Sequence, residues 1–236
     1  MRKSSDRLSD RGNVMTQVQD KTSNQMLIES EPSILVVDNL SDVFNAQMEE
    51  PVRCVLFQRQ LRGDYDGLAT AMGKITGVHS GLGINLTSLK ELGKKIDMTE
   101  GQALAFRQIC DDLEILPAES KGVRLLAPQG YQRGSFVNAF HQDKGIPGDR
   151  FLAAYNIAGS DILRPQDIAS NRSPGDIEIY VPKEDAQIIH IPVGSIWRQT
   201  VNYIDENKRT HKVGLIHRAP QGLCGTVPRL LLVSYR

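Results

Sequence analysis

Seven short apolar runs between Gly122 and the C-terminus constrain the fold of this chain more than any other feature. Each run is rich in Val, Ile, Leu or Tyr, and Gly, Pro, Asn or Asp separates it from the next. The runs are GVRLLAP, RFLAAYNIAG, DIEIYVP, QIIHIPVG, SIWRQTV, HKVGLIH and RLLLVSY. Strands spaced in this way, without helical patterns between them, are typical of an antiparallel sandwich or jelly roll. We therefore predict a mainly β fold.

The residues before Gly122 predict a tail and flanking N-terminal helices. Residues 1–30 are rich in Ser, Asp, Arg and Gln and have almost no aliphatic periodicity, which predicts a disordered tail. SILVVDNL and CVLFQRQL read as two short strands, and residues 64–77 predict a short helix interrupted by Gly73. We expect residues 31–236 to form a single domain with a helical N-terminal part.

The strongest helical pattern is DMTEGQALAFRQICDDLEIL. Two capping boxes can start this helix, one formed by Asp97 with Glu100 and the other by Thr99 with Gln102. Apolar residues then recur at helical spacing, which predicts a helix that faces the core.

Charge and cysteine usage argue against several classes of function. Lys and Arg number 28 and Asp and Glu also number 28, so no global field favours nucleic acid or an anionic membrane. No apolar run approaches the roughly 20 residues that cross a bilayer, and the first residues lack the pattern of a signal peptide. Cys54, Cys110 and Cys224 are scattered and form no C-x-x-C motif, which argues against a disulfide framework or a zinc knuckle. We expect a cytoplasmic protein whose partners are small molecules.

His141 and Asp143 lie two positions apart, just ahead of a strand-like run. In an extended segment such residues project to one face and can bind one metal ion. His217 lies on a later strand-like run that a jelly roll can fold back beside the first. Two imidazoles and one carboxylate form the facial triad of non-haem Fe(II) oxygenases, which leaves positions open for a bidentate ligand and dioxygen. Zinc accepts the same donors.

Arg229 begins the last strand-like run, RLLLVSY. An arginine in an apolar strand is costly unless a carboxylate matches its guanidinium, and the distal carboxylate of 2-oxoglutarate would do so in a bidentate pair. Arg218 is a rival for this role, but it neighbours His217 and would point to the opposite sheet face. Tyr155 is expected in the core, with hydrogen bonding to a bound oxo acid as the alternative.

The order H-x-D, distant His and then Arg on the next strand resembles the Fe(II)/2-oxoglutarate-dependent oxygenase superfamily, whose fold is a double-stranded β-helix. More narrowly, FHQD, PVGSIW, GLIHRAP and PRLLLVSY resemble the DUF1826 family of uncharacterised bacterial proteins. The resemblance implies a hydroxylase-type dioxygenase that acts on an unknown substrate. It implies that His141, Asp143 and His217 bind Fe(II) and that Arg229 holds the cosubstrate, 2-oxoglutarate.

Other interpretations of these residues stay open. A zinc hydrolase can use the same ligands, although no carboxylate is clearly placed as its general base. A noncatalytic β-sandwich is the third alternative, with His141 and Asp143 in a surface turn and His217 at a strand end. His190 and His211 are candidate replacements for His217, although neither is followed by an arginine on a short return strand.

Overall fold

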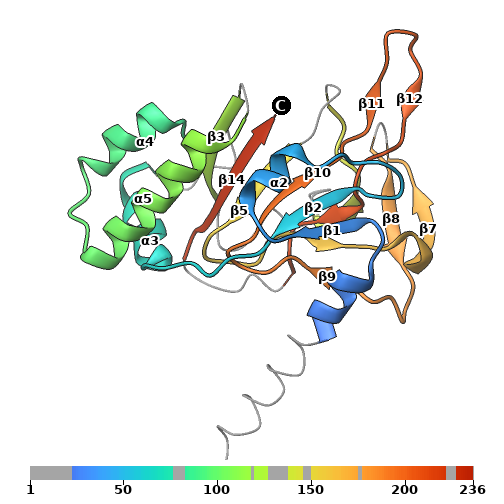
Figure 1. Cartoon of the computed structure of the whole chain (residues 1–236), viewed down its shortest axis with the longest axis horizontal. Coiled ribbons are helices and arrows are strands. Elements are labelled where there is room, and N and C mark those ends of the chain that lie inside the picture. Colours follow the sequence, from blue (N-terminus) through green and yellow to red (C-terminus); the bar gives the residue numbers. More distant parts are fainter. Residues whose placement is uncertain are drawn as a thin grey trace, which may run out of the picture.

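The computed structural model of the chain describes residues 23–76, 83–117, 120–126, 138–145, 150–174, 177–221 and 227–235. Two six-stranded β-sheets form the centre of this part, and the helices between Tyr65 and Ile115 gather at one side (Figure 1). The prediction of a mainly β fold with N-terminal helices is therefore confirmed. Residues 1–22 of the predicted tail and the position of Cys224 lie outside the described residues. None of the described helices is long and apolar enough to cross a membrane.

The first sheet has the strand order β1-β2-β10-β5-β14-β3. Strands β1 and β2 pair in parallel, and the other neighbours in this sheet pair antiparallel. The strands of the first sheet are β1 (Ile34–Val37), β2 (Cys54–Phe57), β3 (Ser120–Leu126), β5 (Arg150–Ala154), β10 (Ile196–Gln199) and β14 (Arg229–Tyr235).

The second sheet has the strand order β7-β8-β4-β13-β6-β9, and all its pairs are antiparallel. Several of its strands are only two residues long, because turns and a short 3-10 helix, η2 (Pro165–Asp167), interrupt this layer. The strands of the second sheet are β4 (Phe140–His141), β6 (Asp161–Ile162), β7 (Ile168–Arg172), β8 (Ile179–Pro182), β9 (Ile189–His190) and β13 (His217–Arg218).

The two sheets face each other across an apolar core. One cluster of buried side chains joins Leu56, Trp197 and Leu231 of the first sheet to Ile162 and Ile189 of the second. Because side chains alternate along a strand, the other face of the first sheet must be covered separately.

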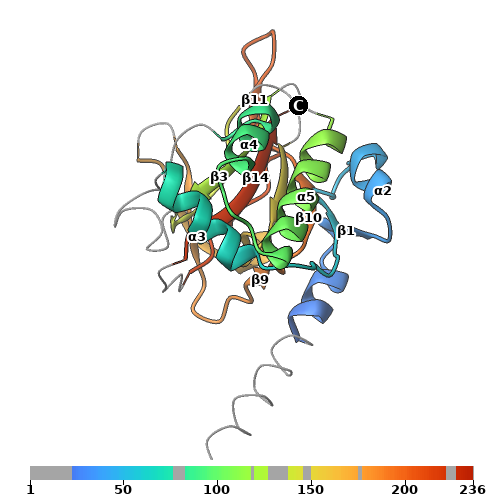
Figure 2. The same cartoon turned by 90° about the vertical axis from the view of Figure 1, so that its left-hand side faces the viewer.

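Helices cover that other face. Figure 2 shows α3, α4 and α5 in front of the first sheet. A second apolar cluster joins Leu68, Leu89 and Ile109 of these helices to Phe151 and Leu232 of the sheet. The molecule therefore has three layers, with the first sheet in the middle. The labelled helices are α2 (Leu40–Asn45), α3 (Tyr65–Thr76), α4 (Leu86–Gly93) and α5 (Glu100–Ile115).

The helical predictions are partly confirmed. Helix α5 begins with a capping box of Thr99 and Gln102, the second of the two predicted alternatives. Helix α3, by contrast, runs through Gly73 without interruption. A single glycine costs a helix only about 1 kcal/mol, and the burial of Leu68 and Met72 in the core offsets this cost.

Residues 23–30, which the sequence placed in a disordered tail, form a helix below β9 (Figure 1). Ile28 is fully buried in the core between the sheets. The Asn24 side chain donates to the carbonyl of His190 and accepts from its amide, both at 2.8 Å. These contacts anchor the segment, and a sequence pattern without aliphatic periodicity does not reveal them.

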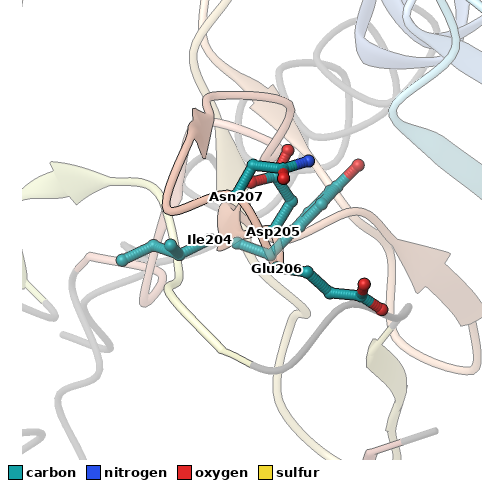
Figure 3. A pocket seen from close by; sticks show the side chains of 5 residues that line it. Ile204, Asp205, Glu206 and Asn207 are labelled. Atoms are coloured by element: carbon teal, nitrogen blue, oxygen red, sulfur yellow. The ribbon is translucent and has the colours of Figure 1, made fainter.

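Strands β11 (Tyr203–Ile204) and β12 (Thr210–His211) form a hairpin that projects from the sheets as an arm (Figure 1). The arm connects the end of β10 to the start of β13. Ile204 near its tip is 62% exposed. Residues Tyr203 to Asn207 line an open pocket of about 520 Å³ on the arm (Figure 3).

Candidate metal centre

Two histidines from distant parts of the chain lie side by side in the second sheet. His141 of β4 and His217 of β13 are direct partners in the antiparallel register. Their ring centroids are 4.8 Å apart, and the ring planes are tilted by 41°. His141 is 3% exposed and His217 is 6% exposed. Both imidazoles therefore project from neighbouring strands into one buried space.

Backbone carbonyls fix the protonation pattern of both imidazoles. Nδ1 of His141 lies 2.8 Å from the carbonyl oxygen of Ala139, and Nδ1 of His217 lies 3.0 Å from that of Leu215. A carbonyl oxygen only accepts hydrogen bonds, so each Nδ1 carries a proton. In the neutral imidazole the lone pair is then on Nε2, which is the arrangement of histidines that bind metals.

Asp143 brings a carboxylate to the same space. Its Oδ1 lies 3.6 Å from Nε2 of His141, and its Oδ2 lies 3.4 Å from Nε2 of His217. The ligand atoms of the three residues all lie within 4.8 Å of one another. Within the described part of the chain, this is the one group of three or more such residues that can hold a metal ion.

The backbone around Asp143 is held by the base of the arm. The Asn202 amide donates to the carbonyl of Asp143 at 2.8 Å, and the Gly145 amide donates to the carbonyl of Asn202 at 3.0 Å. The Asn202 side chain donates to Gln142 at 3.1 Å and accepts from the Gly214 amide at 2.8 Å. The segment that carries the carboxylate is thus tied to both sides of the arm.

Two further side chains contact the Asp143 carboxylate. Arg150, the first residue of β5, forms an ion pair with Oδ2. Gln199, the last residue of β10, lies with its Nε2 at 3.3 Å from the same oxygen. Burial by itself would raise the pKa of Asp143. Contacts with the imidazoles of His141 and His217, together with the positive charge of Arg150, outweigh it and hold this pKa well below its usual range. The carboxylate is therefore ionised at neutral pH.

The donor set fits a divalent transition metal. It offers two imidazole nitrogens and one carboxylate from one side of a shared space, as in the facial triad, and both Fe(II) and Zn(II) accept these donors. Two lone pairs and an anion that converge in a buried space repel one another unless a cation or protons separate them. A cation bound between the three side chains would remove this repulsion.

Arg229 lies on the inner face of β14. Leu231 and Val233 of the same strand pack in the core between the sheets. Because residues two apart on a strand project to the same side, Arg229 shares their face. Its exposed fraction is 2%, and its guanidinium donates to the carbonyls of Ala158 and Gly159, each at 3.0 Å. The guanidinium therefore points between the sheets and not into solvent.

The structure does not place Tyr155 with this cluster. Its hydroxyl donates to Asp112 of α5 at 2.7 Å, and its ring stacks on Tyr65 of α3 at 5.6 Å. Tyr155 belongs to the core under the helices, on the opposite face of the first sheet. The expectation that Tyr155 lies in the core therefore holds, and the alternative, a hydrogen bond to the oxo acid, does not agree with this position.

The rival residues also lie elsewhere. Arg218 pairs with Asp161 at 2.9 Å and lies over the Phe140 ring, on the outer face of the second sheet. His190 contacts the same carboxylate at 2.7 Å, and its side chain is 56% exposed. His211 lies on the arm beside Asp205.

Sequence reasoning missed Arg150, Gln199 and Asn202. A pattern signal existed for Gln199, because residues two apart on a strand share a face and Trp197 is an obvious core residue. The contacts of Arg150 and Asn202 with the Asp143 segment depend on the paths of loops, which no local pattern specifies.

A search against protein-family models finds no match to the chain. A comparison with curated proteins likewise finds no match.

Proposed function

We propose that the chain is an Fe(II)- and 2-oxoglutarate-dependent oxygenase, built on a double-stranded β-helix and similar to the DUF1826 family. The observation that carries the proposal is the convergence of His141, Asp143 and His217 in one buried space, with both Nε2 atoms facing the carboxylate.

The strand arrangement supports the jelly roll. Two antiparallel layers face each other, and successive strands β3, β4, β5 and β6 alternate between the first and the second sheet. The final strands β13 and β14 do the same, and this alternation brings each late strand beside an early one. The histidine of β13 thereby meets the H-x-D segment that begins at the end of β4.

Each residue has a defined part in the proposed chemistry. His141, Asp143 and His217 would hold the metal from one side, and the low exposure of both imidazoles would exclude water from it. Bound iron would supply the reaction of dioxygen with 2-oxoglutarate, which releases carbon dioxide, puts one oxygen atom into succinate and leaves the other to oxidise a second substrate.

Arg229 would orient the cosubstrate. A planar guanidinium pairs with a carboxylate through two parallel hydrogen bonds, and such pairs are strongest where water is excluded. The buried position of Arg229 on the inner face of β14 supports this role.

The test is a spectroscopic titration without oxygen. Fe(II) and 2-oxoglutarate are added to the wild-type protein, and we expect a weak visible charge-transfer band that requires both. The band should be lost or displaced to much higher 2-oxoglutarate concentration in Arg229→Ala. It should persist in the matched control Arg218→Ala, because Arg218 pairs with Asp161 on the outer face.

Two results count against the proposal. Stoichiometric metal binding without any band in the wild type would favour a zinc enzyme on the same ligands. An absence of metal binding would favour a noncatalytic β-sandwich.

A further inference from the structure

The amide of Gln199 contacts two of the three proposed metal ligands at once. Its Nε2 lies 3.3 Å from Oδ2 of Asp143 and 3.4 Å from Nε2 of His217. Gln199 is fully buried at the end of β10. A buried amide destabilises the fold unless its hydrogen bonds are satisfied, and these two contacts satisfy its NH₂ group.

Trp197 determines which end of the amide faces the cluster. Its Nε1 lies 2.9 Å from Oε1 of Gln199, and an indole N–H only donates. The atom that accepts this bond must be the amide oxygen, so the NH₂ group faces Asp143 and His217. Trp197 is itself fully buried and packs in the core between the sheets, which holds the amide in this orientation.

The two hydrogens of this NH₂ group have separate acceptors. One points to the carboxylate of Asp143. The other points to the Nε2 lone pair of His217, since Nδ1 of that ring donates to Leu215. A metal ion bound by His217 would take this lone pair, and the second N–H would then need another acceptor beside the ion.

We propose that Gln199 is a positioning residue of the metal centre. It holds Asp143 and His217 in place before an ion binds. Afterwards it donates the freed N–H to an oxygen or nitrogen anion, or a water, that binds the ion as an exogenous ligand. This inference rests on the proposed metal centre, and it predicts that exogenous anions bind on the side of the ion that faces β10.

The experiment uses Co(II), whose visible spectrum reports the geometry of its ligands. The full-length wild-type protein is loaded with Co(II) and titrated first with azide and then with 2-oxoglutarate. The test variant is Gln199→Met, which keeps the length of the side chain and removes both N–H donors. The matched control is Gln58→Met, because Gln58 follows Phe57, which pairs with Ile196 at the opposite end of β10.

In Gln199→Met we expect Co(II) affinity to fall by about tenfold, as for other residues that orient metal ligands. We also expect a changed Co(II) spectrum and a further loss of about tenfold in azide affinity. Gln58→Met should match the wild type in all three. A weaker Co(II) affinity with an unchanged spectrum and unchanged azide affinity would overturn the proposal, because Gln199 would then serve only the fold.

A second variant covers the case in which Gln199→Met does not fold. Trp197→Phe removes the N–H that orients the amide and leaves every cluster residue in place. It should weaken azide binding several-fold more than it weakens Co(II) binding, and equal affinities to those of the wild type would contradict the inference. If the wild type binds azide but not 2-oxoglutarate, the oxygenase proposal fails while the role of Gln199 is still decided by azide.

Discussion

A buried carboxylate, Asp112, and a half-buried one, Asp143, have opposite surroundings. Asp112 is met only by donors, which are the guanidinium of Arg59, the hydroxyl of Tyr155 and the amide of Gln108. Asp143 is met by Arg150 and Gln199 on Oδ2, but it also faces two imidazole Nε2 atoms. The first carboxylate is fully satisfied by the protein. The second leaves lone pairs that a cation can satisfy, and this difference separates a structural ion pair from a metal site.

The structural role of Asp112 gives a stability prediction. Asp112→Asn leaves the partly buried charge of Arg59 without its carboxylate, and breaking such a pair costs about 3 kcal/mol. Asp111→Asn is the matched control, because Asp111 is exposed and its replacement should change stability by less than about 0.5 kcal/mol. Urea unfolding of the metal-free variants measures both, and equal stabilities of the two variants would show that the Arg59 pair contributes little.

At the scale of elements, the arm joins two residues of the candidate metal centre along the chain. Gln199 ends β10 at one foot of the hairpin, and His217 begins β13 at the other. The base of the arm also holds the Asp143 backbone through Asn202. The tip, by contrast, has exposed residues and no contact with the cluster among the described interactions.

The base of the arm should therefore matter more to metal binding than its tip. Asn202→Ala removes the bonds to Gln142 and Gly214, and we expect metal affinity to fall by about tenfold or more. Asn207→Ala, at the exposed tip, removes the same side-chain type and should leave the affinity unchanged. Calorimetric titration with Co(II) compares them, and a similar loss in both variants would contradict the distinction between base and tip.

Sequence patterns predicted these elements unevenly. The apolar runs that became β5, β10 and β14 were recognisable because their side chains are buried on both faces, between the second sheet and the helices. The short strands β4 and β13 carry the two histidines of the candidate site, yet each strand holds only two residues. Their pairing follows from the sheet as a whole, so the sequence identified the ligands by spacing and residue type and not by the strands themselves.

At the scale of the whole molecule, the candidate metal centre lies between residues of the two sheets, and the charge of Asp143 is linked to the stability of the fold. The pKa of Asp143 is lower in the folded protein than its ordinary value of 3.8. The folded state therefore favours the ionised carboxylate and is stabilised by it. This stabilisation is complete at pH values above the ordinary pKa, and it is lost as the pH falls towards the pKa in the folded protein.

The variant Asp143→Asn has no carboxyl group at this position, so it lacks the pH-dependent stabilisation that Asp143 gives the wild type. Between about pH 5 and pH 3, the free energy of unfolding of the metal-free wild type should therefore fall more steeply than that of the variant. Unfolding in urea at several pH values measures the two slopes. Parallel slopes would mean that Asp143 is not held as an ion by its neighbours.

The most direct measurement is the metal stoichiometry of the wild type and of four histidine variants, determined by anaerobic calorimetric titration with Fe(II) or Co(II). We predict one ion per chain in the wild type, in His190→Ala and in His211→Ala, because those two imidazoles contact Asp161 and Asp205 away from the cluster. In His141→Ala and His217→Ala the affinity should fall by at least about 100-fold, since each loses one of only three ligands. One ion per chain in all four variants with wild-type affinity, or no ion in the wild type, would contradict a metal centre at His141, Asp143 and His217.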